Sequence, residues 1–175
     1  MAMATVAMEV VPQDMAWSSF DDQYLNCSVK ISKKFHELQQ SDFLKNEKFA
    51  RNWAKAMAQW QKQGSVSSPL IPDQAIALMA YTMKELNLYK EFNDAMREAG
   101  NSSWKYQNEF HFKSLHFLLT HALQKLRRPN DCKVVYQGVS RYQYRVNKDD
   151  KVRFGQFAST SLRKTVAQVM GRIRY

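Results

Sequence analysis

The sequence predicts an α+β domain, in which helices come first and a small sheet follows. Apolar residues recur at helical spacing through about the first 130 residues, and short β-rich segments replace this pattern from Cys132 onward. The length of 175 residues and the hydrophobic content of 45% are those of one packed globular domain. We therefore place a single domain over residues 10–175, with a helical part at residues 14–130 and the start of a β part at residues 132–175.

The helical part contains a clearly amphipathic segment between two end signals. Asn46 is a suitable N-cap, and Gly64 is suited to end a helix. The residues at i, i+4, i+8 and i+11 of this segment form one apolar stripe: Phe49, Trp53, Met57 and Trp60. We interpret this stripe, and the similar stripes downstream, as hydrophobic core and not as a cofactor-binding box.

Three further helices are expected before the strands begin. Pro72 suits the first turn of a helix whose inward residues are Ile76, Met79, Ala80 and Met83. Gly100 ends the next helix, with the stripe Leu88, Phe92, Ala95, Met96 and Ala99. A long helix then continues until Pro129 forbids it, with inward residues Trp104, Phe112, Leu115, Leu118, Leu119, Ala122 and Leu126.

The C-terminal part reads as strands and turns. Three segments are short and rich in β-branched and aromatic residues: 133–137, 141–146 and 151–158. Asn147-Lys148-Asp149-Asp150 supplies turn chemistry, and a helix is expected within residues 161–170. Ser159-Thr160-Ser161 lies where strand gives way to helix, a place where such residues also serve as ordinary caps. About three strands leave an unpaired edge, which we interpret as a sign that the chain stops early.

The positive charge is concentrated towards the C-terminus. Residues 125–175 supply the whole net charge of +10, because acidic and basic side chains balance over residues 1–124. Such a tail is compatible with nucleic-acid binding, or with half of a balanced domain. Tyrosines alternate with arginines over residues 141–145, so the two kinds of side chain would occupy opposite faces of a strand. We therefore do not expect nucleic acid as a partner.

Neither a metal site nor a membrane span is predicted. Cys27 and Cys132 are far apart and form no C-x-x-C pair. His111, His116 and His121 are five residues apart, so their rings cannot converge on a helix and are expected at its surface or boundary. No apolar run approaches the ~18 residues that a membrane span needs.

Two features bear on secretion. Asn26-Cys27-Ser28 and Asn101-Ser102-Ser103 are Asn-x-Ser/Thr triplets, which are compatible with secretion but also arise by chance. Residues 1–9 lack a basic segment, and Glu9 interrupts their apolar run, so they do not form a complete signal peptide. We interpret residues 1–9 as the remnant of a signal or as a mis-assigned start.

Four separated motifs, which occur in one order along the chain, point to a known family. They are Phe20-Asp21-Asp22-Gln23-Tyr24, Leu88-Tyr89-Lys90-Glu91-Phe92-Asn93, Phe112-Lys113-Ser114-Leu115-His116-Phe117-Leu118-Leu119, and the pair formed by Val135-Tyr136-Gln137-Gly138-Val139-Ser140 with Val152-Arg153-Phe154-Gly155-Gln156-Phe157-Ala158-Ser159-Thr160-Ser161-Leu162. Over roughly residues 10–170 the chain resembles the vertebrate arginine-specific mono-ADP-ribosyltransferases, here C-terminally truncated.

This resemblance implies an activity, a substrate and a place. The family splits the bond between nicotinamide and ribose in NAD and transfers ADP-ribose to an arginine of an acceptor protein. NAD is then the substrate, no metal is needed, and the β part is the beginning of an incomplete NAD-binding half. The resemblance also implies a secreted or extracellular-surface protein. It further implies that Cys27 and Cys132 each pair with a downstream cysteine, so we do not expect them to bridge each other.

The resemblance assigns site residues one by one. Ser159 is the first Ser of the family's Ser-Thr-Ser, expected to hold the catalytic Glu and to contact the nicotinamide ribose. Gln137 stands at the position of the family's Arg in Tyr-Arg-Gly, and Gly138 fits close approach to the nicotinamide amide. Gln156 resembles an NAD contact, although a regular strand would point it away from Ser159. Tyr89 is a candidate adenine-side contact, with core packing as the alternative.

We expect the chain as given to be weakly active or inactive. The family's Glu-x-Glu is absent, since no Glu follows Glu109. Gln137 carries neither the charge nor the fork of donors with which an Arg binds phosphate. The alternative interpretation is a non-catalytic protein, either a decayed paralogue or a binding module whose basic tail engages acidic partners.

Overall fold

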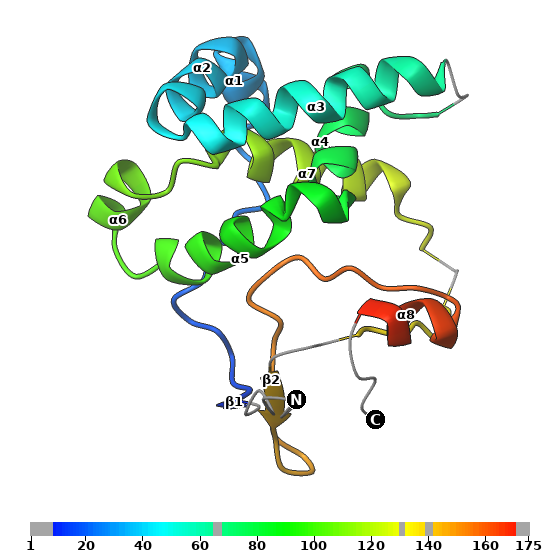
Figure 1. Cartoon of the computed structure of the whole chain (residues 1–175). Helices are drawn as coiled ribbons and strands as arrows, with labels where there is room; N and C mark the ends of the chain where they lie inside the picture. Colours follow the sequence, from blue (N-terminus) through cyan, green and yellow to red (C-terminus); the bar gives the residue numbers. More distant parts are fainter. Residues whose placement is uncertain (1–8, 65–67, 130–131, 139–141, 171–175) are drawn as a thin grey trace, which may run out of the picture. The chain divides into compact units, whose positions relative to one another are not determined.

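The computed structural model describes residues 9–64, 68–129, 132–138 and 142–170. It is mostly helical with little strand (Figure 1). The chain divides into two compact units, which we call unit 1 (Met1–Trp17 and Pro129–Tyr175) and unit 2 (Ser18–Arg128). Some predicted features lie outside the described residues: residues 1–8 of the predicted remnant, Val139 and Ser140 of the motif, and Arg141 of a predicted strand.

Unit 2 is built from helices joined by short loops. They are α1 (Ser28–Lys33), α2 (Phe35–Lys45), α3 (Glu47–Gln63), α4 (Pro72–Thr82), the 3-10 helix η1 (Lys84–Leu86), α5 (Leu88–Ala99), α6 (Ser103–Asn108) and α7 (Lys113–Leu126). Within the described residues, no helix is both long and apolar enough to span a bilayer.

The predicted helix boundaries of α3, α4 and α5 are confirmed. The Asn46 side chain accepts a hydrogen bond from the backbone N of Phe49 at 2.9 Å and so caps α3. Gly64 follows α3 with a φ of +73°, a conformation that favours glycine. Pro72 is the first residue of α4, and α5 ends directly before Gly100.

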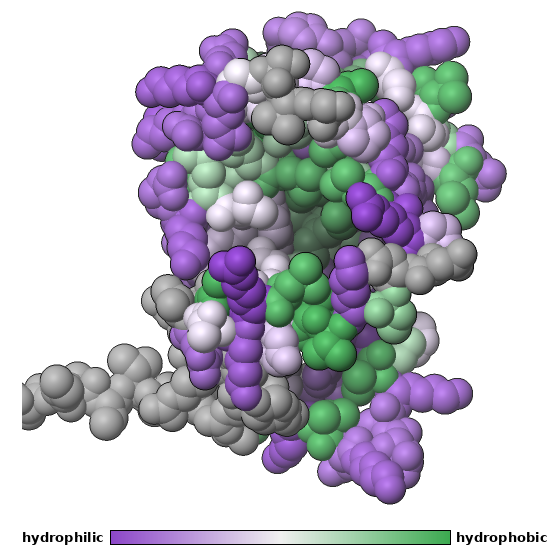
Figure 2. Space-filling view, turned by 90° about the vertical axis from the view of Figure 1, so that its right-hand side faces the viewer, coloured by the Kyte–Doolittle hydropathy of each residue, from purple (hydrophilic) through white to green (hydrophobic). Residues whose placement is uncertain are grey.

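The hydrophobic core lies in unit 2. Helix α4 packs against α3 and α7, and α2 packs against α3 and α7. Of the buried apolar side chains in the described ranges, all but Ala167 belong to this unit. On the face seen in Figure 2, by contrast, apolar side chains are exposed among hydrophilic ones. Burial in the described chain is therefore concentrated in the helices.

The core stripe of α3 was only partly predicted correctly. Phe49 and Trp53 are buried, whereas Met57 is exposed. The buried face continues instead through Asn52 and Ala56, because residues three and four apart lie on one side of a helix. The i+8 position of Met57 had therefore drifted off that face.

The single long helix predicted up to Pro129 is wrong. Helix α6 ends at Asn108 and α7 begins at Lys113. Between them Phe110 and Phe112 are both buried, although residues two apart in a helix point in different directions. Breaking the helix brings both rings into the core. As a result Trp104 and Leu126, predicted to face inward, are exposed.

Unit 1 combines the first and last parts of the described chain. Strand β1 (Glu9–Pro12) pairs in parallel with β2 (Tyr142–Arg145), with Glu9 beside Tyr142 and Pro12 beside Arg145. The backbone N of Gln13 extends this pairing with a 3.0 Å bond to the carbonyl of Arg145. Helix α8 (Lys164–Met170) follows near the C-terminus. The sequence analysis had not predicted a strand at β1.

Arg153 holds the segment after β1 inside unit 1. Its Nε donates to the carbonyl of Met15 and its Nη2 to that of Ala16, both at 2.9 Å. Its backbone N also donates to the carbonyl of Asp14 at 2.9 Å. One arginine therefore satisfies three successive carbonyl groups of a segment far away in the sequence.

The predicted strands are only partly present. Residues 151–158 form no strand, because the Arg153 backbone pairs with Asp14 and not with a neighbouring strand. Residues 133–137 form only one bridge, at Tyr136, and the strand predicted at residues 141–146 is observed as β2. The predicted turn is confirmed: the Asp150 backbone N donates to Asn147, and Asp149 has a φ of +72°.

Candidate functional site

A single pair of residues joins the two segments that the sequence analysis selected in the β part. The backbone N of Tyr136 donates to the carbonyl of Ser161, and the backbone N of Ser161 donates to that of Tyr136, both at 2.8 Å. This exchange of two bonds is the narrow pair of an antiparallel ladder. Gln137 and Gly138 directly follow one member of this pair, and Ser159 and Thr160 directly precede the other. The two motifs are therefore neighbours within unit 1.

The three hydroxyl residues of the Ser-Thr-Ser triplet have different environments. The Oγ of Ser161 accepts a hydrogen bond from the backbone N of Arg163 at 3.0 Å, just before α8. Ser161 thus closes a local side-chain-to-backbone turn directly before the helix. Ser159 is half-buried and Thr160 is exposed. The hydroxyl of Ser161 thus has a local backbone partner, two residues after the predicted site residue Ser159.

The remaining candidates of unit 1 lie close by in the sequence. Gln137 and Gly138 are half-buried, as is Gln156, which follows the buried Gly155. The argument that a regular strand turns Gln156 away from Ser159 does not apply, since residues 151–158 are not a strand. The Tyr136–Ser161 bridge lies within two residues of Gln137, Gly138 and Ser159, whereas Gln156 is five residues away from Ser161 in the sequence.

Tyr89 belongs to unit 2 and lies in the first turn of α5. Its side chain is 42% exposed, so the alternative of core packing is wrong for this residue. Its ring makes an edge contact with Tyr81, at 6.4 Å between centroids. The other candidate residues all belong to unit 1.

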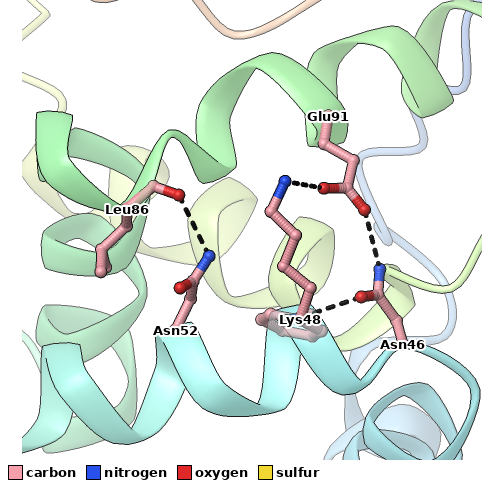
Figure 3. Close-up of polar contacts among 6 residues, drawn as sticks. Asn46, Lys48, Asn52, Leu86 and Glu91 are labelled. Carbon is pink, nitrogen blue, oxygen red and sulfur yellow. Dashed lines mark hydrogen bonds and ion pairs between the residues drawn. The ribbon is translucent and has the colours of Figure 1, made fainter.

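Polar contacts from α3 fix the start of α5, the helix that carries Tyr89 (Figure 3). Asn52 donates from Nδ2 to the carbonyl of Leu86 at 3.2 Å, at the end of η1. Lys48 forms an ion pair with Glu91 at 2.7 Å, and both side chains come from helix turns that face each other. These contacts connect α3 to the residues on either side of Tyr89. They therefore fix the position of the first turn of α5, in which Tyr89 lies.

A buried pair in unit 2 was missed by the sequence analysis. The Tyr24 hydroxyl and Nδ1 of His116 lie 2.7 Å apart, and His116 is only 2% exposed. Burial lowers the pKa of His116 to about 4 and raises the pKa of Tyr24. The prediction of surface or boundary histidines is therefore wrong for His116. The sequence signal was the run Leu115-His116-Phe117-Leu118-Leu119, which is apolar all round the helix apart from His116, as in a buried central helix.

A second buried contact joins α2 to the start of α7. Oδ2 of Asp42 accepts hydrogen bonds from both the backbone N and the Oγ of Ser114, each at 2.7 Å. The carboxylate therefore satisfies a free N–H at the beginning of α7, as a capping residue would. Burial raises the pKa of Asp42, and the two bonds from Ser114 oppose that shift. Both buried contacts serve the scaffold of unit 2.

The described ranges hold no cluster of possible metal ligands and no disulfide. No group of three or more His, Cys, Asp or Glu side chains that could hold a metal ion occurs among them. Cys27 is half-buried in unit 2, Cys132 is exposed in unit 1, and both are free thiols in this structure.

Comparisons with known proteins define the class. The family model described as NAD:arginine ADP-ribosyltransferase matches residues 13–173, and the chain belongs to this family. It is 46% identical to NAD(P)(+)--arginine ADP-ribosyltransferase 2 of Gallus gallus, over 93% of this chain and 53% of the relative. It is 44% identical to the GPI-linked NAD(P)(+)--arginine ADP-ribosyltransferase 1 of Mus musculus, over 91% and 53%.

A solved structure agrees with the fold. A mutant of the eukaryotic mono-ADP-ribosyltransferase ART2.2 in complex with NAD is 38% identical, with a TM-score of 0.76 over 91% of this chain and 68% of that chain. The family predicted from the four motifs is therefore confirmed. The chain spans about half the length of the curated relatives it matches.

Proposed function

We propose that this protein is an NAD-dependent protein-arginine mono-ADP-ribosyltransferase that binds NAD at the paired segments 136–138 and 159–161. The supporting observation is the antiparallel bridge between Tyr136 and Ser161, which brings together the segments that contain Gly138 and Ser159. Both segments come from motifs that resemble the family's NAD site. On this proposal unit 1 is the beginning of the NAD-binding half, and unit 2 is the helical subdomain of one domain over residues 10–175.

The chemistry of the family explains why the pair matters. Breaking the nicotinamide–ribose bond leaves positive charge on the ribose, as in the transition state of glycoside hydrolysis. Such a site needs a fixed carboxylate, donors for the pyrophosphate and a surface for the nicotinamide. Gly138 has no side chain and lets the nicotinamide amide approach the backbone. Ser159 would place its hydroxyl near the nicotinamide ribose, and Gln137 would offer an amide donor towards the pyrophosphate.

The same residues limit the activity that we propose. Gln137 replaces a charged fork by a neutral amide, and a charge-assisted hydrogen bond contributes roughly 1.5–3 kcal/mol, or about 10–100-fold in affinity. No Glu follows Glu109 in this sequence, so the downstream carboxylate of the family pattern has no counterpart in the residues given. The proposed activity of the 175-residue chain is therefore NAD binding with weak transfer.

The proposal also names partners and a location. The acceptor is a protein with an exposed arginine, and NAD is consumed as a substrate without a metal. An extracellular location is supported by the GPI-linked relative of Mus musculus, whose name places it at a membrane surface. Nucleic acid is not a proposed partner.

Titration of the 175-residue protein with NAD tests the site. We expect Gln137→Arg to tighten NAD binding more than tenfold, because it restores the bidentate phosphate contact. Gln59→Arg adds the same charge on an exposed position of α3 and should leave the affinity unchanged. Equal affinities of the wild type and Gln137→Arg would show that position 137 does not face NAD.

A second pair of variants tests the other segment. Ser159→Ala should weaken NAD binding several-fold, by the loss of about one hydrogen bond. Thr165→Ala removes an exposed hydroxyl of α8, outside the proposed site, and is the matched control. If the two variants bind NAD equally well, the serine is not in the site.

The alternative of a non-catalytic paralogue is favoured by Gln137 alone. NAD binding by the wild type and by the Gln137→Arg variant distinguishes this alternative from the main proposal. A decayed protein would show no NAD binding in the wild type and no gain in the Gln137→Arg variant. Detectable NAD binding that strengthens in this variant would exclude it.

A further inference from the structure

The loop between α5 and α6 carries one of the two Asn-x-Ser triplets. Asn101 lies in a turn directly after α5, its side chain is exposed, and its backbone N donates to the carbonyl of Glu98 at 3.1 Å. The preceding Gly100 donates to the carbonyl of Ser18 at 2.8 Å. A Cβ at Gly100 would lie 2.6 Å from the carbonyl oxygen of Ser19, so the turn is tightly packed on this backbone. The turn is therefore well defined while Asn101 remains accessible.

The two serines of this triplet have separate roles. Ser102 is the N-cap of α6, and its Oγ accepts a hydrogen bond from the backbone N of Lys105 at 3.1 Å. Ser103 is the first residue of α6 and is exposed. Helix capping thus depends on the middle residue, whereas the acceptor sequence depends on Asn101 and Ser103.

A large apolar side chain follows directly. Trp104 is 61% exposed, although it had been predicted to face inward. A single exposed aromatic is normal on a protein surface, and this one is of interest because it lies beside a modification sequence. The carbon-rich face of a sugar is chemically suited to pack on an indole ring. Trp104 is three residues from Asn101 in the sequence and directly follows the acceptor triplet, in the first turn of α6.

We propose that Asn101 is the attachment site of an N-linked glycan and that its first sugar packs on Trp104. In this step Nδ2 of Asn101 loses a proton and forms a bond to C1 of an oligosaccharide. The bond between C1 and its lipid pyrophosphate carrier breaks, and the pyrophosphate leaves with the bonding electrons. The inference rests on the extracellular location proposed above, because N-glycosylation belongs to the secretory route.

The other triplet differs in its packing. The Oγ of Ser28 lies 3.3 Å from Nε2 of His121, and Cys27 is half-buried. Ser28 thus contacts α7 and Cys27 is half-buried, whereas the two residues after Asn101 are exposed. A glycan at Asn101 leaves the fold of unit 2 undisturbed, so the proposal is limited to this site.

The test uses the 175-residue chain with a cleavable secretory leader, expressed in animal cells on an Asn26→Gln background. We expect one glycan, seen as a mobility shift that peptide N-glycosidase removes and as a glycopeptide in mass spectrometry. Asn101→Gln and Ser103→Ala should each abolish the shift. Ser102→Ala is the matched control, because it removes the helix cap but keeps the acceptor triplet, and it should retain the glycan.

The possible results distinguish a failure of the Asn101 glycan site from a failure of the proposed location or of NAD binding. An unshifted chain that is nevertheless secreted, or a shift that persists in Asn101→Gln, would overturn the site. The leader supplies the location, so a failure of the proposed extracellular location does not affect this result. NAD binding is measured separately, on unglycosylated protein from bacteria. A negative result there would contradict the proposed function without affecting the glycan site.

The contact with Trp104 has its own readout. Removal of the glycan should increase quenching of tryptophan fluorescence by acrylamide, a neutral quencher, because the indole becomes exposed. The same treatment of a Trp104→Phe chain should leave the quenching of the remaining tryptophans unchanged. If enzymatic removal has equal effects in both chains, the glycan does not cover Trp104.

Discussion

The Tyr24–His116 hydrogen bond places an ionisable ring inside unit 2, among the rings of Phe20, Phe92 and Phe110. Burial lowers the pKa of His116 from its ordinary 6.5 to about 4, while the charge of Asp22 opposes the shift. The unfolded chain therefore binds a proton at a higher pH than the folded chain does. Because of this difference, His116 contributes to the free energy of unfolding fully above about pH 6.5. The contribution is lost progressively as the pH falls from about 6.5 to about 4.

This sign gives a prediction for acid stability. We expect the His116 contribution to make unfolding about 2 kcal/mol easier at pH 5 than at pH 7. Urea denaturation measures the decrease in the free energy of unfolding between pH 7 and pH 5. This decrease should be smaller for His116→Gln, which retains polar side-chain atoms but does not titrate. Buried Asp42 titrates with the opposite sign in both proteins, since its pKa is raised, and therefore cancels in the comparison. Parallel pH profiles of the wild type and the variant would contradict the prediction.

Which residues could be predicted depends on how far away their partners are. Asn46, Gly64 and Pro72 act within one helix turn, so local rules identified them. His116 and Asp42 depend on partners 92 and 72 residues away, and no local pattern specifies such a distance. The same holds for the candidate site. The motifs identified Gln137, Gly138 and Ser159, but only the structure shows that their segments form an antiparallel pair.

At the scale of elements, the joint between α3 and α5 depends on Asn46. Its Oδ1 caps α3 at Phe49, while its Nδ2 donates to Glu91 of α5 at 3.5 Å. We expect Asn46→Ala to lower the free energy of unfolding by about 1 kcal/mol, chiefly through the lost cap. Asn46→Ser can still cap but cannot reach Glu91, and should lose only a few tenths. Equal losses in the two variants, measured by chemical denaturation, would mean that the Glu91 contact dominates.

The segment after β1 provides the second prediction at this scale. Arg153→Gln removes donors to the carbonyls of Met15 and Ala16, and each charge-assisted bond contributes about 1.5–3 kcal/mol. We expect amide exchange at Gln13 and in β2 to accelerate at least tenfold, with helices α3 to α5 unchanged. Lys151→Gln removes an exposed charge from the same segment and is the control. Unchanged protection in Arg153→Gln would exclude a role for this contact in holding β1.

Helices and strands were predicted with different success for a physical reason. Amphipathic helices such as α3 and α5 form their hydrogen bonds internally, so their sequences contain most of the information. A strand needs a partner, and propensity alone does not name it. Segment 151–158 has suitable residues, yet its backbone pairs with Asp14, and β1 was not predicted because its partner lies beyond unit 2 in the sequence.

At the scale of the whole molecule, the chain is an arginine ADP-ribosyltransferase family member in which one proposed charged contact is replaced. We expect the 175-residue protein to transfer ADP-ribose to a small guanidine acceptor only in traces, far below about 1 per second. The reasons are Gln137 and the lack of any Glu after Glu109. Labelled NAD measures the transfer. Turnover at an ordinary enzymatic rate would show that neither Gln137 nor the missing Glu limits the activity.

The parallel pairing of β1 with β2 has a consequence for the order of folding. Strand β1 is synthesised first, but its partner follows about 130 residues later. Closing a flexible loop of that length costs roughly 4 kcal/mol in chain entropy, before any contact offsets it. Unit 2 shortens this search once it has folded, because Gln124 near its end donates to the carbonyl of Gln23 near its beginning at 3.2 Å. Folding of the helices thus shortens the effective loop between the two strands. During synthesis, β1 stays unpaired until β2 has emerged from the ribosome.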